Sequence, residues 1–220
     1  MTFAIFGATG NTGMLTARYC LRAGHKARAL VRDPRKMPAL PEDPGGGIEI
    51  IKGDATNPLS VAELIRGADI VVAALGPRDL QTGFKVHSSA ALYLSRLMPE
   101  AGISRYVTVS GASVSVPEDK FSVRGKFFSA AAYLFAKTSG NLKKMLADKQ
   151  KEYEILKGSE LDWTVVRPPW IVPGDYERDA NITPSKLTGS KVRAPELAKA
   201  VVDIALNGRF NKQAVFINSV

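Results

Sequence analysis

The sequence predicts an α/β fold in which a doubly wound parallel sheet is covered by helices on both faces. Two observations carry this prediction. Apolar strand-like segments alternate with helix-like segments along almost the whole chain, and the first strand runs directly into three glycines spaced three residues apart. With 220 residues, of which 45% are hydrophobic, the chain can bury one sizeable core, so residues 1–220 are expected to form a single domain.

The first strand and its glycine turn form the most informative segment, FAIFGATGNTG. Gly7 suits a tight turn at the strand end, Gly10 leaves the backbone open to a ligand, and Gly13 lets the next helix pack closely on the sheet. That helix starts near Asn11 and ends at Gly24, so its unpaired N–H groups and positive dipole end face the turn. The segment predicts a site for the pyrophosphate of a dinucleotide, and a glycine turn that binds no nucleotide is the alternative.

The other elements follow in regular alternation. Strands are expected at residues 3–6, 25–31, 48–52, 68–75, 105–109, 162–167 and 214–218. Helices are expected at 11–24, 58–66, 86–98, 121–157 (in two pieces, broken near Ser139–Gly140) and 195–206. Residues 37–47 and the segment from 168 to about 192 are rich in proline and glycine and indicate loops. Because parallel strands joined by helices need right-handed crossovers, this order gives a doubly wound sheet.

The chain is basic, with 30 lysine and arginine residues against 21 aspartate and glutamate residues and a net charge of +9. Part of the excess lies between Lys120 and Lys157. This stretch is consistent with a solvated basic helix face, with guidance of an anionic substrate or, least of all, with nucleic acid. No nucleic-acid recognition motif accompanies the charge, so no nucleic-acid partner is expected.

The location of the protein is also constrained by the sequence. Cys20 is the single cysteine, which excludes an internal disulfide and suits a reducing compartment. The first strand starts so early that no targeting segment is expected before it, and no apolar run is long enough to span a membrane. We therefore expect a cytoplasmic protein without membrane contact, and no metal site is expected.

The residue after the second strand bears on cofactor choice. An NAD site usually places a carboxylate about 20 residues past the glycine turn, to hold the ribose 2′-hydroxyl. Arg32 stands there instead, and its planar guanidinium suits a 2′-phosphate, which favours NADPH over NADH. The neighbouring Asp33 pairs with Arg35 or contacts a ribose.

The residues after the third and fourth strands suggest further cofactor contacts. Asp54 follows the third strand and either accepts a hydrogen bond from an adenine amino group or caps the turn before the helix at Pro58. Leu75 and Gly76 follow the fourth strand, where they would run under the ribose on the nicotinamide side. Arg78 either contacts a phosphate or acidic substrate or is a plain surface arginine.

Five stretches carry a family resemblance: IFGATGNTG, LVRDP after the second strand, GDAT after the third, LGPRD after the fourth and VVRPPWI after the sixth. In these stretches the chain resembles the atypical short-chain dehydrogenase/reductases, closest to the branch with biliverdin-IXβ reductase (also a flavin reductase) and NmrA-like proteins. The resemblance implies a Rossmann fold. The cofactor-binding residues that it implies, together with those inferred from their positions after the strands, are Gly7, Thr9, Gly10, Asn11, Thr12, Arg32, Asp54, Ala55, Leu75, Gly76, Arg78, Ser110, Pro168 and Pro169.

The resemblance also points to catalytic positions. Tyrosine-dependent relatives carry a Tyr-x-x-x-Lys pair on the fifth helix, and the equivalent positions here are Met145 and Lys149, so the lysine is retained without the tyrosine acid. Tyr133 has the same spacing to a lysine but lies too early in the chain, and its stretch indicates an apolar helix face. Ser110 and Lys149 are therefore the expected catalytic residues.

Two histidines characterise the biliverdin and flavin reductase branch, and their positions are occupied here by Lys149 and Trp170. The chain's own histidines, His25 and His87, are expected to be ordinary residues at the surface or at element ends.

The resemblance implies hydride transfer from NADPH to a planar acceptor such as a flavin, a quinone or a linear tetrapyrrole. Substrate-side insertions are expected at about 112–145 and 170–193, with Phe121, Trp170 and Ile171 lining the substrate. The alternative is a non-catalytic, NmrA-like protein that senses NADP(H) and signals to a protein partner. The oligomeric state is expected to be monomer or homodimer.

Overall fold

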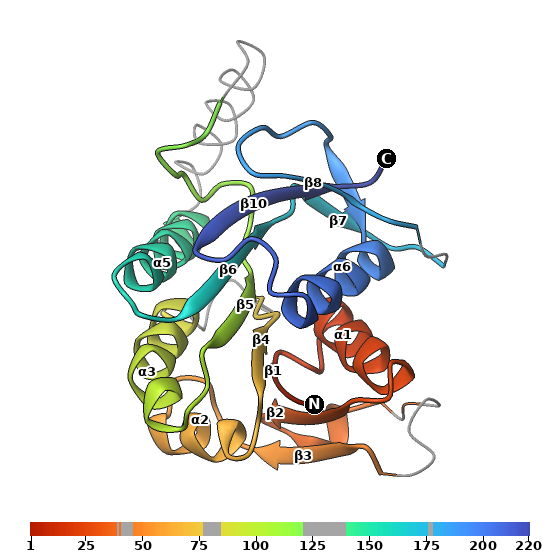
Figure 1. Ribbon diagram of the computed structural model, residues 1–220, viewed down its shortest axis with the longest axis vertical. Coiled ribbons are helices and arrows are strands. Elements are labelled where there is room, and N and C mark those ends of the chain that lie inside the picture. Colours follow the sequence, from red (N-terminus) through yellow and green to blue (C-terminus); the bar gives the residue numbers. More distant parts are fainter. Residues whose placement is uncertain (39, 41–45, 77–84, 121–139, 176–177) are drawn as a thin grey trace.

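The computed structural model describes residues 1–38, 40, 46–76, 85–120, 140–175 and 178–220. Its core is an eight-stranded sheet in the order β3-β2-β1-β4-β5-β6-β10-β8 (Figure 1). The strands are β1 (Thr2–Phe6), β2 (Lys26–Val31), β3 (Ile48–Lys52), β4 (Ile70–Ala73), β5 (Arg105–Val109), β6 (Asp162–Arg167), β8 (Asn181–Thr183) and β10 (Gln213–Asn218). The doubly wound α/β fold predicted from the sequence is confirmed.

Parallel pairing sets the functional edge of this sheet. Neighbours from β3 through β6 to β10 are all parallel, and β8 pairs antiparallel with β10. β1 lies between β2 and β4, so the chain winds outward in opposite directions from this point. Ligands of open α/β sheets bind at such a reversal, outside the carboxyl ends of the strands.

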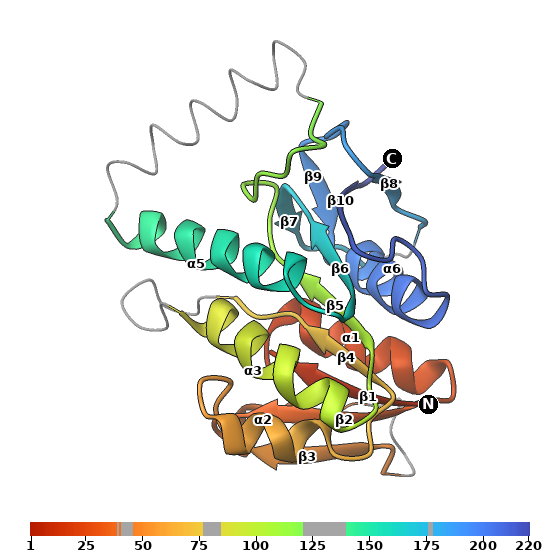
Figure 2. The ribbon, with the colours of Figure 1, turned by 60° about the vertical axis from the view of Figure 1, so that its left-hand side comes forward.

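Helices cover both faces of the sheet. α1 (Asn11–Arg22) and α6 (Ala194–Leu206) lie side by side on one face, and α2 (Pro58–Ile65), α3 (Val86–Glu100) and α5 (Gly140–Lys157) cover the other (Figures 1 and 2). β1 feeds both cores, because Phe3 and Ile5 pack on the α1 side while Ala4 and Phe6 pack on the α3 side. Burial on both faces explains why this strand is apolar from Phe3 to Phe6.

The segment expected to be a loop after β6 contains short strands. β7 (Trp170–Val172) pairs parallel with β9 (Lys191–Arg193), and β8 joins the main sheet through β10. Three-residue strands that pair with distant partners leave too short an apolar pattern to be recognised in a sequence. A 3₁₀ turn, η1 (Pro34–Lys36), was likewise not predicted. The part of the long helix expected at 121–157 that precedes residue 140, including the predicted break, lies outside the described residues, and the described part is α5.

Cys20 is fully buried on α1, and its burial raises the pKa of the thiol to about 12. Because the thiolate is the reactive species, we expect the native protein to resist thiol reagents at neutral pH and to react stoichiometrically once unfolded. The rate of labelling across a denaturant series should follow global unfolding measured by circular dichroism. Rapid labelling of the native protein would contradict the packing of α1 against the sheet.

Gly13 permits the close approach of α1 to the end of β1. A Cβ at this position would lie 2.3 Å from the carbonyl oxygen of Gly7, so Gly13→Ala must push the start of α1 away from the turn at Gly7. We expect the free energy of unfolding to fall by about 1–3 kcal/mol, measured by denaturant titration. The matched control is Gly140→Ala, at the start of α5, where a Cβ meets nothing within 4 Å. Equal stability of the two variants would show that the approach is not a constraint.

Candidate functional site

Seven parallel strands end at one edge of the sheet, and predicted site residues follow six of them, β1 to β6. Gly7 follows β1, Arg32 follows β2, and Gly53 with Asp54 follows β3. The segment from Ala74 follows β4, while Ser110 and Pro168 follow β5 and β6 directly. The described part of the chain therefore brings these predicted residues to a common edge.

The glycine turn has the predicted geometry. Gly7 adopts a positive φ of 76°, and a Cβ on it would lie 2.3 Å from the carbonyl oxygen of Ala74, next to β4. The N–H of Gly10 donates to the carbonyl of Gly7 over 2.9 Å, which closes the turn. The turn thus connects β1, β4 and α1 through backbone contacts that leave no room for larger side chains.

The start of α1 is suited to an anion. Gly10 is its N-cap, no described side chain makes a capping hydrogen bond, and its first turn, which begins with Asn11 and Thr12, contains no acidic residue. Helix N-termini carry unpaired N–H groups and a partial positive charge. A diphosphate satisfies both, so the turn fits the cofactor phosphates that the sequence predicted.

Arg32 and its neighbours lie beyond the end of β2. Arg32 is exposed, whereas Asp33 is engaged by Arg35, whose Nε and Nη2 lie 2.9 and 3.1 Å from its carboxylate oxygens. The hydrogen bond from Arg35 lowers the pKa of Asp33. Of the two roles open to Asp33 in the sequence, the structure shows the pairing with Arg35.

Asp54 organises the turn after β3. Its Oδ1 accepts hydrogen bonds from the backbone N–H and the hydroxyl of Thr56, at 2.8 and 2.6 Å. Partial burial raises the pKa of Asp54, but the bonds from Thr56 and the charge of Arg32 outweigh it, so the pKa lies below its ordinary value. α2 itself is capped by Asn57, not by Asp54. The next predicted residue, Ala55, is buried in the core.

The ends of β5 and β6 are tied together. Ser110 N–H donates to the carbonyl of Val166 and Ala112 N–H to that of Pro168, both over 2.9 Å. Ser110 is buried, and its Oγ has no hydrogen-bond partner among the described residues. A buried hydroxyl without a partner is unfavourable, so Ser110 Oγ is a polar atom that still needs a hydrogen-bond partner.

Lys149 reaches the same place from α5. Its Nζ donates to the carbonyl oxygen of Ser110 over 2.7 Å, so the two residues predicted to be catalytic are in contact. Burial lowers the pKa of Lys149, and the negative charges of Glu152 and Asp148 oppose this shift.

A buried ion pair holds the start of the first substrate-side segment. Arg167, at the end of β6, donates from Nη1 and Nη2 to the two carboxylate oxygens of Asp119, over 2.8 and 2.7 Å. Arg167 also donates to the carbonyl of Val114 and packs over the ring of Phe216. These contacts fix residues 114–119 against the strand that leads into Pro168 and Pro169.

The structure describes only some of the other residues that were predicted to contact the substrate or the cofactor. Trp170 and Ile171 lie on β7 with 77% and 41% of their surface exposed, and Leu75 and Gly76 lie at the end of β4. Arg78 and Phe121 lie outside the described residues, as does Tyr133. The described surface thus contributes two exposed apolar side chains to the expected substrate region.

His87 was predicted to be an ordinary residue at the surface or at an element end, and of these two positions the structure shows the element end. It is the second residue of α3 but is only 1% exposed, because α5 covers the start of that helix. Its Nδ1 lies 3.4 Å from Oε2 of Glu152, which is also buried. His25, in contrast, lies at the start of β2, with Nδ1 3.4 Å from the N-terminal amine.

Sequence reasoning missed the carboxylates of α5. Asp148 accepts hydrogen bonds from the backbone N–H groups of His87 and Ser88 at 2.9 and 3.1 Å, and so caps α3 from another helix. Glu152 accepts from Thr108 Oγ1 at 2.8 Å. The available signal was the spacing of four residues between Asp148 and Glu152, which puts both on one face of the helix.

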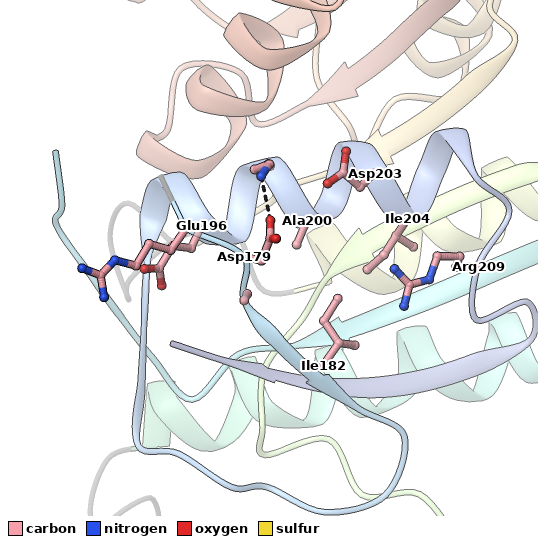
Figure 3. Close-up of a pocket in the computed structure, with 10 residues that line it drawn as sticks. Asp179, Ile182, Glu196, Ala200, Asp203, Ile204 and Arg209 are labelled. Atoms are coloured by element: carbon pink, nitrogen blue, oxygen red, sulfur yellow. Dashed lines mark hydrogen bonds and ion pairs between the residues drawn. The ribbon is translucent and has the colours of Figure 1, made fainter. Parts of the chain in front are cut away.

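A pocket lies away from the carboxyl edge, between α6 and the segment 178–182 (Figure 3). Asp179 and Lys199 form an ion pair across it at 2.7 Å, and Glu196, Asp203 and Arg209 contribute further charge. None of the predicted site residues lines it, so it is separate from the site at the carboxyl edge.

None of the described helices is both long and apolar enough to cross a bilayer.

Several curated proteins are similar to this chain in sequence. The chain is 29% identical over 170 residues to an uncharacterized chloroplastic protein of Arabidopsis thaliana, covering 74% of this chain and 57% of that protein. It spans between 26% and 57% of the length of the curated relatives that it matches.

Solved structures share the fold. A short-chain dehydrogenase/reductase from Veillonella parvula, in complex with NADP, is 18% identical with a TM-score of 0.75, over 99% of this chain and 94% of that one. The anaerobillin reductase ChuY from Escherichia coli O157:H7 is 20% identical with a TM-score of 0.75, over 100% and 97%.

A family model described as NAD(P)H-binding matches residues 7–207, from the first glycine of the turn to the end of α6. The match includes every strand end described above except that of β10. The chain belongs to the NAD(P)H-binding family.

Proposed function

We propose that this protein is an NADPH-dependent oxidoreductase that transfers a hydride to a planar acceptor such as a flavin, a quinone or a linear tetrapyrrole. The observation that carries the proposal is the contact between Lys149 and Ser110 at the carboxyl edge of the sheet. An ammonium on the Ser110 carbonyl and an unpartnered Ser110 hydroxyl are polar groups that a nicotinamide or its acceptor can use.

The edge offers a place for each part of the cofactor. The start of α1 would hold the diphosphate, and Arg32 the 2′-phosphate, since Asp33 is occupied by Arg35. The segment after β4 and the residues Pro168 and Pro169 would line the nicotinamide. When bound, the reduced nicotinamide supplies the hydride.

The protein's own groups would orient the reactants and manage charge. Ser110 Oγ donates a hydrogen bond to the nicotinamide amide or to the acceptor, and the charge of Lys149 stabilises negative charge that develops on the acceptor. Trp170 and Ile171 offer exposed apolar surface on which a planar acceptor can stack. That an anaerobillin reductase shares the fold is consistent with an acceptor of this shape.

A second candidate is an NADP(H)-sensing protein without catalysis. Met145 is half-buried on α5, one turn before Lys149, where the tyrosine-dependent relatives have their acid. A site that binds the cofactor without this group suits a protein that reports cofactor occupancy to a partner. Tight NADPH binding without turnover distinguishes this function from the reductase.

Replacing Arg32 tests the assignment of the 2′-phosphate. We expect Arg32→Ala to weaken NADPH binding by about 1–3 kcal/mol and to leave NADH binding nearly unchanged, because charge-assisted bonds to the 2′-phosphate are lost. Tryptophan fluorescence titration measures both affinities. The control, Arg66→Ala, removes an exposed arginine that precedes β4 at the opposite edge of the sheet. Equal weakening of NADPH and NADH would refute the assignment.

Turnover tests the reductase itself. Stopped-flow oxidation of NADPH is expected with at least one flavin, quinone or tetrapyrrole, and Lys149→Gln should lower the maximal rate by about 100-fold. The exposed Lys151 on the same helix supplies the control variant Lys151→Gln. If NADPH binds but no such acceptor is reduced, the sensor replaces the reductase as the function.

A further inference from the structure

A buried polar cluster of His87, Asp148 and Glu152 lies where α3 and α5 meet, and two of its members are neighbours of Lys149 on α5. We propose that a proton taken up by His87 balances the charge of Glu152, so that cofactor binding at the edge where Lys149 meets Ser110 is linked to this proton. The inference rests on the proposed NADPH site, which it deepens.

The pair is held by three elements. Glu152 on α5 is fully buried, and its Oε1 accepts from Thr108 Oγ1 on β5 at 2.8 Å. Its Oε2 lies 3.4 Å from His87 Nδ1 on α3, and neither atom has a hydrogen-bond partner among the described residues. Buried polar atoms of this kind need compensation. A proton on the imidazole compensates the carboxylate of Glu152, because the opposite charges of the two groups then attract each other across this distance.

The surrounding groups account for the other charges. The carboxylate of Asp148 binds the start of α3, where it accepts hydrogen bonds from the backbone N–H groups of His87 and Ser88 and from the Ser88 hydroxyl. Tyr106 Oη lies 3.5 Å from Glu152 Oε1, and burial raises the pKa of Tyr106 well above its ordinary value, so it faces the pair as a neutral phenol. Lys85, beside His87 in sequence, is exposed.

The charge balance explains why a proton matters. With His87 neutral, the carboxylates of Asp148 and Glu152 face one ammonium, that of Lys149, and leave one net negative charge beside the site for an anionic cofactor. With His87 protonated, the four charges cancel, and Lys149 remains available at the Ser110 carbonyl. Since uncompensated buried charge is unfavourable, the neutral cluster is the state that an anionic cofactor selects.

This gives a sign for the pH dependence. Histidine is the side chain that ordinarily changes charge between about pH 5 and pH 8. Loss of the His87 proton leaves the cluster negative, so NADPH binding weakens. As pH falls, protonation of His87 strengthens binding.

Affinity measurements at about pH 6 and about pH 8 test this linkage. Between them, the wild type should lose about three- to tenfold more NADPH affinity than His87→Asn, as expected for one charge acting across several ångströms. The 2′-phosphate also titrates in this range but contributes equally to both proteins. The control, Glu154→Gln, changes an exposed carboxylate on α5 and should behave as the wild type. An identical pH dependence of the wild type and His87→Asn would overturn the proposal.

Nuclear magnetic resonance tests the pair without activity. The chain has two histidines, so ¹⁵N-histidine labelling gives one signal set for His87 and one for His25 as an internal reference. In Glu152→Gln the His87 titration should move to lower pH, while that of His25 stays in place. Unchanged titration of His87 in this variant would also overturn the proposal, and thermal unfolding of both variants shows whether they are folded.

The two proposals fail in different ways. A wild-type protein that binds NADPH with the expected pH linkage but reduces no acceptor overturns the reductase and supports the role of His87. A wild-type protein that does not bind NADPH overturns both.

Discussion

The close backbone approach at the glycine turn is the constraint on which the rest of the structure depends. Gly7 lies against the carbonyl of Ala74, and Gly13 lies against the carbonyl of Gly7, so β1, β4 and α1 meet without intervening side chains. The same approach presents the start of α1 at the carboxyl edge of the sheet. Packing and phosphate recognition therefore require the same glycines, and a substitution here affects both.

The other half of the site is built differently. Around Ser110 and Lys149, position depends on side chains that are buried and charged, supported by Asp148, Glu152 and His87. Such groups are stable only when each has a partner, so the loss of one member leaves the others uncompensated. The diphosphate half is thus fixed by backbone shape, and the half that faces the nicotinamide is fixed by charge.

The sequence was sufficient for the order of the large elements, because strands buried on both faces are continuous apolar runs and glycine marks several of their ends. It also placed Ser110 and Lys149 in one site, through the family resemblance. It could not show that α5 covers the start of α3, which buries His87, since that contact joins residues about 60 positions apart. The strands β7 and β9 were missed because a three-residue strand is defined by its partner and not by its own pattern.

Burial of β1 on both faces has a consequence for folding. In a sheet with one solvent-exposed face, shifting the pairing register of a strand by one residue exposes its apolar side chains to water and is therefore unfavourable. Here such a slip would exchange Phe3 and Ile5 with Ala4 and Phe6 between the two hydrophobic cores. Burial of apolar side chains alone therefore selects the register of β1 against its neighbours only weakly. The fit of Gly7 at Ala74 supplies the missing selection, because any other residue brought to that point by a slip carries a Cβ that the Ala74 carbonyl excludes.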